Sequence, residues 1–440
     1  MKKNIELLFR QKLDELEKLI QNESKQFKSI ELLTTAEKVL ANKSQNLSKE
    51  IIHKYLNLTK SPYFLSKLKN REERYRWAET AFKAIRASEY SLLNMINYQV
   101  EFNPEKNLFS VFEGSVRNNY NYKTVADKIS KLAAAFYKHS GPQPKIAIYS
   151  DNCIEEALCD LSCLSYDIFV SPLNSHFNAD NLSHIFSLLK FNVVVTDTLQ
   201  RVKILKSIRE NIGYDFSILF LGNLNNQENK TDTLNFENFI SSVNPQEVSE
   251  ILEKRYRYKP DDISTTMFTS GSTGVPKGVV FTNYTLISKR FARGAALPDV
   301  GKDETLLCFL PLFHTFGRYF EMLGTIYWGG NYVFAGKNDI ESLLQLMKQV
   351  KPTGLVSIPL RLKEIYERVN ERAENLTEKK SRQKILREIV GENLRWGISA
   401  AGYLEPKVFK FFNSSSVALC SGFGMTEATG GISMTPPGEY

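Results

Sequence analysis

The sequence has few cysteines and no long hydrophobic run, and both shortages narrow what the chain can be. Its 440 residues include five cysteines, an odd and unevenly spaced set that is too small for a disulfide framework and fits a reducing compartment. Apolar runs such as residues 308–313 fall far short of the roughly 20 residues that a membrane-spanning helix needs. The basic N-terminus is interrupted by charged residues, which excludes a secretory signal. We therefore expect a cytoplasmic protein.

The one cluster of cysteines is a poor candidate for a metal site. Cys159 and Cys163 can share a helix face beside Cys153, but the sequence offers no fourth ligand nearby. We expect these side chains to be buried free thiols.

The chain has enough apolar residues for a large core, and its basic excess is confined to one end. Hydrophobic residues make up 42% of the 440 residues, a size typical of two or three structural units. Residues 1–100 hold 19 Lys and Arg against 12 Asp and Glu, so they carry +7 of the formal net charge of +8. The basic excess therefore belongs to the N-terminal segment.

The first hundred residues have the pattern of helices. Apolar residues recur every three or four positions over residues 4–20, and residues 30–40 and 71–96 contain few helix breakers, with a break at Ser61 and Pro62. We expect residues 1–100 to form a basic helical extension. Its Lys and Arg side chains are either simply solvated, which we favour, or form a face for peripheral contact with an anionic membrane or an acidic protein.

From residue 101 onward, short β-branched runs alternate with helical stretches. This alternation predicts an α/β domain over residues 101–440, with two mainly parallel sheets that share helices, because so many strands exceed one comfortable sheet. The predicted strands are residues 145–149, 168–172, 193–196, 217–221, 263–268, 306–310, 332–335, 355–358, 394–399 and 417–421.

The most informative segment is a loop rich in glycine and hydroxyl side chains at residues 269–278. It reads Thr-Ser-Gly-Ser-Thr-Gly-Val-Pro-Lys-Gly between two apolar stretches. Glycines let backbone N–H groups approach an anion, the hydroxyls add donors, and Lys277 supplies a mobile positive charge. The loop therefore predicts a phosphate site. It is not a Walker loop, because Lys277 stands between Pro276 and Gly278 rather than before Ser or Thr.

With its flanks, this loop resembles the signature loop of the AMP-forming adenylating enzymes, which include acyl-CoA synthetases, luciferases and the adenylation domains of peptide synthetases. In that family the lysine and the loop hydroxyls meet the triphosphate of ATP. The resemblance therefore assigns ATP contacts to Thr269, Ser270, Gly271, Ser272, Thr273, Gly274 and Lys277.

A second segment in the family's order is residues 310–317, Leu-Pro-Leu-Phe-His-Thr-Phe-Gly. It resembles the segment that lines the family's carboxylate pocket, where His314 corresponds to a ring near the reacting acid. A lone histidine is more often structural than catalytic, so this role depends on the neighbouring motif. We assign His314 to substrate positioning rather than to proton transfer.

Two later segments complete the resemblance to a nucleotide site. Residues 398–404 resemble the family's adenine-contacting turn, although Ala400, Ala401 and Tyr403 depart from its usual Gly-Gly-Ala-Pro pattern. Residues 421–427 resemble its Tyr-Gly-Met-Thr-Glu element. The nucleotide contacts implied by these two segments are Ala401, Gly402, Tyr403, Gly422, Phe423, Gly424, Met425 and Thr426.

The second of these segments also implies roles in the reaction. Phe423 keeps an aromatic face for stacking on adenine, Thr426 would contact the α-phosphate, and Glu427 would bind Mg²⁺, a hard cation that prefers oxygen ligands. The resemblance thus implies that a carboxylate attacks the α-phosphorus of ATP while Mg²⁺ and Lys277 offset the charge of departing pyrophosphate. Coenzyme A would then displace AMP. No nucleic-acid partner is expected.

The substrate and the extent of the chain lead to further expectations. Residues 351–359 and 364–367, the charged stretch that follows and Arg318 resemble long-chain fatty acyl-CoA synthetases, so we favour a long-chain fatty acid. The chain stops before the hinge and the small C-terminal lid domain with its adenylation lysine. The alternatives are therefore an acid-thiol ligase whose activity belongs to a complete protein, an acyl-AMP ligase with an acceptor other than coenzyme A, or a noncatalytic nucleotide- or acyl-binding module.

Overall fold

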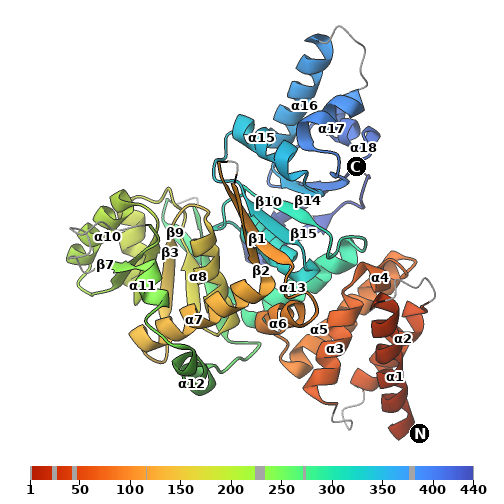
Figure 1. The fold of residues 1–440 in the computed structure, drawn as a ribbon, viewed down its shortest axis with the longest axis horizontal. Helices are drawn as coiled ribbons and strands as arrows, with labels where there is room; N and C mark the ends of the chain where they lie inside the picture. The colour runs from red at the N-terminus through yellow and green to blue at the C-terminus, as the bar shows by residue number, and fades with distance from the viewer. Residues whose placement is uncertain are drawn as a thin grey trace.

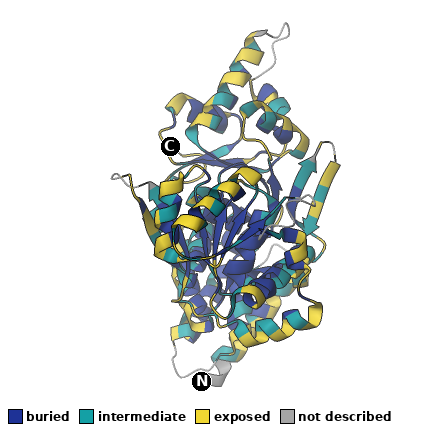
Figure 2. Ribbon diagram, turned by 90° about the vertical axis from the view of Figure 1, so that its left-hand side faces the viewer, coloured by how far each residue is buried: buried dark blue, intermediate teal, exposed yellow. Residues whose placement is uncertain are grey.

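The computed structural model shows three β-sheets surrounded by helices, with the N-terminal helices packed to one side (Figure 1). It describes residues 2–21, 27–41, 47–114, 116–222, 233–270, 274–375 and 382–439. Figure 2 shows that the strands at the centre are largely buried, whereas the surrounding helices expose one face. Among the described residues, no helix is long and apolar enough to cross a membrane.

The first six elements are all helices. The predicted break is observed, because α4 begins at Pro62, but the predicted helix over residues 71–96 is divided: Glu89 adopts a left-handed conformation (φ 55°) and Ser91 caps the next helix. The α5 helix packs on α13, where the Trp77 and Phe291 rings lie 5.8 Å apart. A division of the chain near residue 100 stays a prediction. These helices are α1 (Lys2–Gln21), α2 (Ser29–Ala41), α3 (Lys49–Thr59), α4 (Pro62–Leu65), α5 (Arg71–Ser88) and α6 (Leu92–Phe102).

The largest sheet has seven strands in the order β7-β6-β5-β3-β4-β8-β9, all parallel except for the β8–β9 pair. Side chains alternate between its faces: Ile146 and Ile148 of β3 join the core beneath α7 and α8, whereas Ala147 and Tyr149 join a second core beneath α9 and α10. Its strands are β3 (Lys145–Tyr149), β4 (Phe169–Pro172), β5 (Val193–Thr196), β6 (Ser217–Phe220), β7 (Thr233–Asn235), β8 (Ile263–Ser270) and β9 (Pro276–Thr282). Its helices are α7 (Tyr122–Ser140), α8 (Ile154–Ser165), α9 (Ala179–Leu189), α10 (Leu199–Asn211), α11 (Phe236–Ile240), α12 (Pro245–Arg255) and α13 (Asn283–Ala296).

The remaining strands form two sheets of four, in the orders β10-β11-β1-β2 and β12-β13-β14-β15. Each is parallel apart from an antiparallel edge strand. Their strands are β1 (Asn107–Glu113), β2 (Val116–Asn121), β10 (Thr305–Cys308), β11 (Asn331–Phe334), β12 (Gly354–Ser357), β13 (Trp396–Ser399), β14 (Ala418–Met425) and β15 (Gly430–Met434). The helices that follow α13 are η2 (Phe316–Met322), α14 (Leu323–Trp328), α15 (Ile340–Val350), α16 (Pro359–Asn375), α17 (Arg382–Val390), α18 (Pro406–Ser414) and η3 (Thr426–Ala428).

The predicted α/β class with largely parallel sheets is confirmed, but the described strands form three sheets rather than two. The reason lies where β10 and β12 meet. Thr353 N donates to Thr305 O (3.0 Å), but Thr305 N donates to the Thr353 side-chain oxygen (2.8 Å). A side chain thus takes the place of the next backbone acceptor, and the two strands do not continue as one ladder.

The buried cysteines fit the sequence interpretation. All five are free thiols, and Cys153 is the one that is partly exposed. The described residues contain no group of three or more His, Cys, Asp or Glu side chains that could hold a metal ion.

Candidate active site

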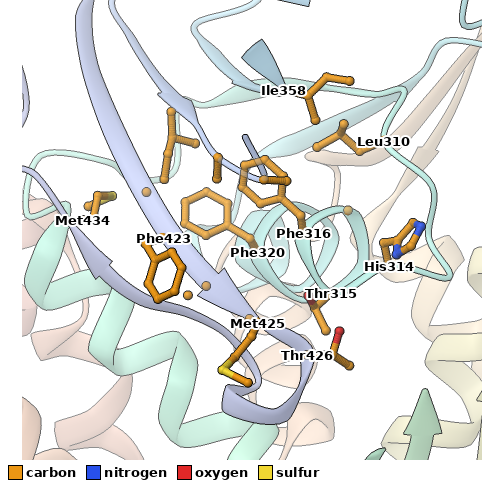
Figure 3. Close-up of a pocket in the computed structure, with 18 of the residues that line it drawn as sticks. Leu310, His314, Thr315, Phe316, Phe320, Ile358, Phe423, Met425, Thr426 and Met434 are labelled. Carbon is orange, nitrogen blue, oxygen red and sulfur yellow. The ribbon is translucent and has the colours of Figure 1, made fainter. Parts of the chain in front are cut away.

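A pocket of about 470 Å³ lies where the carboxyl ends of β10, β12 and β13 meet the β14–β15 hairpin. Ligand sites of open α/β sheets form at this end of the strands. Figure 3 shows the rings of Phe316, Phe320 and Phe423 gathered in the pocket, with His314 to one side. Because most of its lining is apolar, the pocket suits a hydrocarbon or a flat ring better than a strongly polar ligand.

The structure brings three of the four predicted segments to this pocket. The predicted site residues that line it are His314, Ala401, Gly422, Phe423, Gly424, Met425 and Thr426. Gly402, Tyr403, Glu427 and the described residues of the phosphate loop lie outside its lining. Gly271, Ser272 and Thr273, and the side chain of Ser270, are outside the described residues.

The segment that carries His314 is clamped by Asn152, which follows β3. The Asn152 side chain donates to Leu310 O (2.7 Å) and accepts from Leu312 N (3.0 Å). This pair of bonds fixes the loop before η2 and so fixes His314. His314 is exposed at the pocket, but desolvation by its surroundings still lowers its pKa. The imidazole is therefore neutral at neutral pH, which suits positioning by hydrogen bonds better than charge pairing.

Phe316 and Phe320 lie on η2, which is a π-helix. Such helices are rare in proteins, but those that occur are often at functional sites. The η2 helix is anchored by Arg318, a fully buried residue whose Nε donates to Asp160 Oδ2 (2.7 Å) on α8 and whose Nη1 donates to Thr265 Oγ1 (2.9 Å) on β8. This network joins the pocket wall to the seven-stranded sheet. The sequence analysis noted Arg318, which follows the His314 segment, as a point of resemblance to long-chain fatty acyl-CoA synthetases, and the structure does not place it in the pocket lining.

The β14–β15 hairpin forms the wall that faces η2. Gly424 must be glycine here, because a Cβ at this position would lie 2.3 Å from Gly430 O across the hairpin. The next residues carry Thr426, which lines the pocket, and Glu427, which is exposed in η3. Phe423 is 64% exposed, so its ring is available for stacking by a ligand.

The described residues of the predicted phosphate loop lie at the end of β8, at the start of β9 and just before β9. Thr269 pairs with Lys277 in the antiparallel ladder, and Gly274 has the positive φ (79°) that favours glycine. The Lys277 side chain is exposed, and β9 contacts η3. The lysine strand and the Thr426–Glu427 segment, which lie about 150 positions apart in the sequence, are therefore neighbours.

The turn after β13 departs from the Gly-Gly-Ala-Pro sequence of the resemblance, and Ala401 gives it a left-handed bend. Ala401 adopts a left-handed conformation (φ 65°), which an alanine occupies at a cost of roughly 1–2 kcal/mol. Tyr403 is 74% exposed and Gly402 is exposed. Ala401 reaches the pocket, whereas Tyr403 points its ring to solvent.

Arg293 is a charged pocket residue that the sequence interpretation missed. Arg293 of α13 lines the pocket, lies 5.1 Å from the Phe320 ring centre and donates from Nη2 to Gly431 O (3.4 Å). Burial lowers its pKa to about 10. In the sequence, Arg293 is simply an arginine on a helix with an apolar face, and such a pattern does not indicate a pocket. Asn152 likewise carries no sequence signal.

Glu427 is the residue of the site that fits Mg²⁺. Magnesium is usually held by one or two carboxylates together with substrate phosphates and water, so it does not need a dedicated cage of protein ligands. An exposed carboxylate beside the strand of Lys277 meets that requirement.

Comparison with known proteins agrees with this geometry. The family model described as AMP-binding enzyme matches residues 97–440. The chain is 25% identical over 359 residues to long-chain-fatty-acid–CoA ligase 5 of Rattus norvegicus, with 72% of this chain and 52% of the relative covered. It is 22% identical over 360 residues to long-chain-fatty-acid–CoA ligase 1 of Homo sapiens, with 72% and 51% covered. The chain thus spans about half the length of these relatives.

Solved structures share the fold at lower identity. A benzoate CoA ligase from Burkholderia xenovorans LB400 superposes with a TM-score of 0.64 at 14% identity, covering 79% of this chain and 64% of that one. A luciferase-like enzyme from the mealworm Zophobas morio gives a TM-score of 0.61 at 17% identity, with 79% and 74% covered.

Proposed function

We propose, because the chain belongs to the AMP-binding enzyme family, that it activates a carboxylic acid with ATP to an acyl-adenylate and pyrophosphate. We propose further that the acid is a long-chain fatty acid and that the acyl group passes to coenzyme A. One observation carries this proposal. The Thr426–Glu427 segment joins the apolar pocket, which Thr426 lines, to the β8–β9 hairpin, which carries the phosphate loop and contacts η3. One end suits an acyl chain, and the other end suits a triphosphate.

The chain's own residues supply positioning and charge rather than proton transfer. Thr426 would donate a hydrogen bond to the α-phosphate, and Lys277 would offset the charge that develops on pyrophosphate as the carboxylate oxygen attacks phosphorus. Glu427 would hold Mg²⁺, which supplies charge stabilisation at the phosphates when it is bound. His314, whose pKa desolvation lowers, would orient the substrate carboxylate as a neutral ring. Phe423 would stack on the adenine.

The preference for a long acyl chain is supported by the apolar lining and by the names of the curated relatives. Phe316, Phe320 and Met434 form an apolar wall. This wall offers no hydrogen-bond or charge partner for the amino group of an amino-acid substrate. The relatives with 22–25% identity are named as ligases of long-chain fatty acids.

The test is fatty-acid-dependent exchange of labelled pyrophosphate into ATP, measured over a series of chain lengths. The assay is run with the 440-residue chain alone and with a C-terminal domain of a relative added. K277M should lower the exchange severely, whereas K203M, which changes an equally exposed lysine on α10 away from the pocket, should not. Absence of exchange with every carboxylate in the complemented protein would exclude the proposal.

A cytoplasmic location is part of the same proposal, and peripheral membrane contact through residues 1–100 is the alternative to a simply solvated basic face. The support is the basic excess of that segment and the exposure of Leu7 and Leu8 on α1. Sedimentation of the full chain with anionic vesicles should be salt-sensitive, and equal sedimentation with neutral vesicles would contradict membrane contact through the basic face.

A further inference from the structure

Arg293 places a positive charge in the wall of the apolar pocket. The described residues that line this pocket include no Asp, Glu or Lys, and the imidazole of His314 is neutral at neutral pH. Most of the other lining side chains are apolar, Phe316, Phe320 and Met434 among them. A plain hydrocarbon chain has no use for a cation in its binding pocket, because burying a charge is costly unless it is paired. The guanidinium therefore requires a separate explanation.

The charge of Arg293 has no counterion in the part of the chain that the structure describes. Burial alone accounts for its lowered pKa of about 10, since no described carboxylate lies close enough to raise it. Its hydrogen bond from Nη2 to Gly431 O is long, at 3.4 Å. The charged neighbours on α13, Lys289 and Arg290, are cations as well. An anion from outside the chain would therefore be stabilised beside Arg293.

The guanidinium lies between a glycine of the hairpin and a ring of η2. A Cβ at Gly431 would lie 2.5 Å from both Nη1 and Nη2, so this close approach requires glycine. On the other side the Phe320 ring centre is 5.1 Å away, a contact that stabilises the cation only in part. Arg293 Nε is sealed in the wall, whereas Nη1 is not sealed and donates to none of the described residues. A ligand in the pocket can therefore reach Nη1.

Arg293 contacts the part of the pocket that would hold the acyl chain. The proposed function places the reacting carboxylate and the α-phosphate at His314 and Thr426. The ring beside Arg293 is that of Phe320, six positions after His314 in the sequence. In Figure 3 the Phe320 ring lies beyond the Phe316 ring as seen from His314. The acyl chain would thus pass Arg293 after it leaves the reacting end.

We propose that Arg293 determines specificity by binding a second carboxylate of the substrate, so that the pocket selects dicarboxylic acids with an apolar chain between the two acidic groups. Guanidinium and carboxylate match in charge and in bidentate geometry. A hydroxyl or carbonyl oxygen would accept a hydrogen bond but would leave the charge uncompensated. The methylene groups between the two carboxylates would cover the apolar wall.

This proposal rests on the proposed function, because it takes the pocket to be the site of the acid, and it narrows the substrate class. The two are tested separately, since binding of an acid requires no turnover. Pyrophosphate exchange with fatty acids but no preference for a diacid in binding would contradict the role of Arg293 alone. A preference for a diacid in binding but no exchange with any acid would contradict the proposed reaction and leave the role of Arg293 in place.

The test is calorimetric titration of the full chain with hexanedioate, decanedioate and dodecanedioate. Each diacid is compared with the monocarboxylate of the same length and with its own monomethyl ester, which keeps the oxygen atoms and removes the second charge. R293M removes the cation, and R293K keeps the charge without the planar fork. The matched control is R290M, because Arg290 is a buried arginine one turn earlier on α13 that does not line the pocket. Thermal unfolding without ligand checks that each variant folds.

The proposal expects at least one diacid to bind about tenfold or more tightly than its monocarboxylate and its ester. R293M should abolish this preference by weakening the diacid alone, R293K should keep part of it, and R290M should keep most of it. Equal affinity for diacid and monocarboxylate at every length in the original chain would overturn the proposal without any variant. A preference that persists in R293M would also overturn it. So would equal weakening of both acids by R293M, the result expected if Arg293 bound the reacting carboxylate or only held the hairpin.

Discussion

The ion pair of Arg318 and Asp160 offers the sharpest test of how the pocket wall is held. Their side chains are 0% and 5% exposed, and Arg318 also donates to Thr265. R318M removes the cation and leaves the Asp160 carboxylate buried beside Glu156, whose pKa burial already raises well above its usual range. Breaking a buried pair in this way destabilises a protein by about 3–5 kcal/mol. We expect R318M to fall in that range.

The expected change in melting temperature follows from the length of the chain. An unfolding entropy of about 2.1 cal/mol/K per residue amounts to about 0.9 kcal/mol/K for a chain of this size that unfolds as one unit. R318M should therefore lower Tm by about 3–5 °C. Differential scanning calorimetry measures both the shift and whether unfolding occurs in one transition.

Two control variants distinguish the effect of breaking the buried ion pair from the effect of removing any arginine. R368M removes an arginine whose side chain is 45% exposed and which pairs with Glu341 on the surface, and such pairs contribute about 0–1 kcal/mol. The double variant D160N/R318M leaves no uncompensated charge and should be less destabilised than the sum of its single variants. If R318M lowered Tm no more than R368M, the anchoring role of the pair would be refuted.

Three further predictions concern the pocket itself. F423A should weaken ATP binding roughly tenfold in calorimetry through loss of stacking, and unchanged affinity would contradict that role. G424A should lower Tm, because its Cβ would meet Gly430 O; an unchanged Tm would mean that the hairpin is less tight than it appears in the structure. Because desolvation lowers the pKa of His314 from 6.5, stability should fall as pH drops below 6.5, and H314Q should make the decline of Tm down to about pH 5 shallower. An identical decline would contradict the lowered pKa of this ring. Desolvation also lowers the pKa of His53 and of His139, so these two residues should leave part of the decline in place.

Much of the fold could be predicted because buried strands have a strong local pattern. The runs at residues 145–149 and 193–196 are strands with the predicted bounds, since β-branched residues buried on both faces leave a continuous apolar signal. The β2 strand, Val116–Asn121, is a polar edge strand and gave no such signal. The β9 and β15 strands lie in glycine-containing segments that resemble loops, and pairing across a hairpin makes them strands.

The site was predictable only where a motif lies in one continuous segment. The segments around His314 and Phe423 are in the pocket as expected, and the predicted roles of their residues stay predictions. Asn152, which holds the loop before η2, and Arg293, which lines the pocket, were missed because the local sequence around each one indicates only a turn or a helix. Their function depends on contacts with residues more than a hundred positions away, which no local pattern encodes.

The central claim is that the apolar pocket holds an acyl chain and an adenylate together in one adenylation site, and binding of an acyl-adenylate mimic tests it most directly. Dodecanoyl sulfamoyl-adenosine carries both halves of that intermediate and cannot react. We predict that the chain binds it about 100-fold or more tightly than AMP or dodecanoate alone, because one molecule fills both halves at once, and that F423A weakens this binding. An affinity no higher than that of AMP would contradict the account.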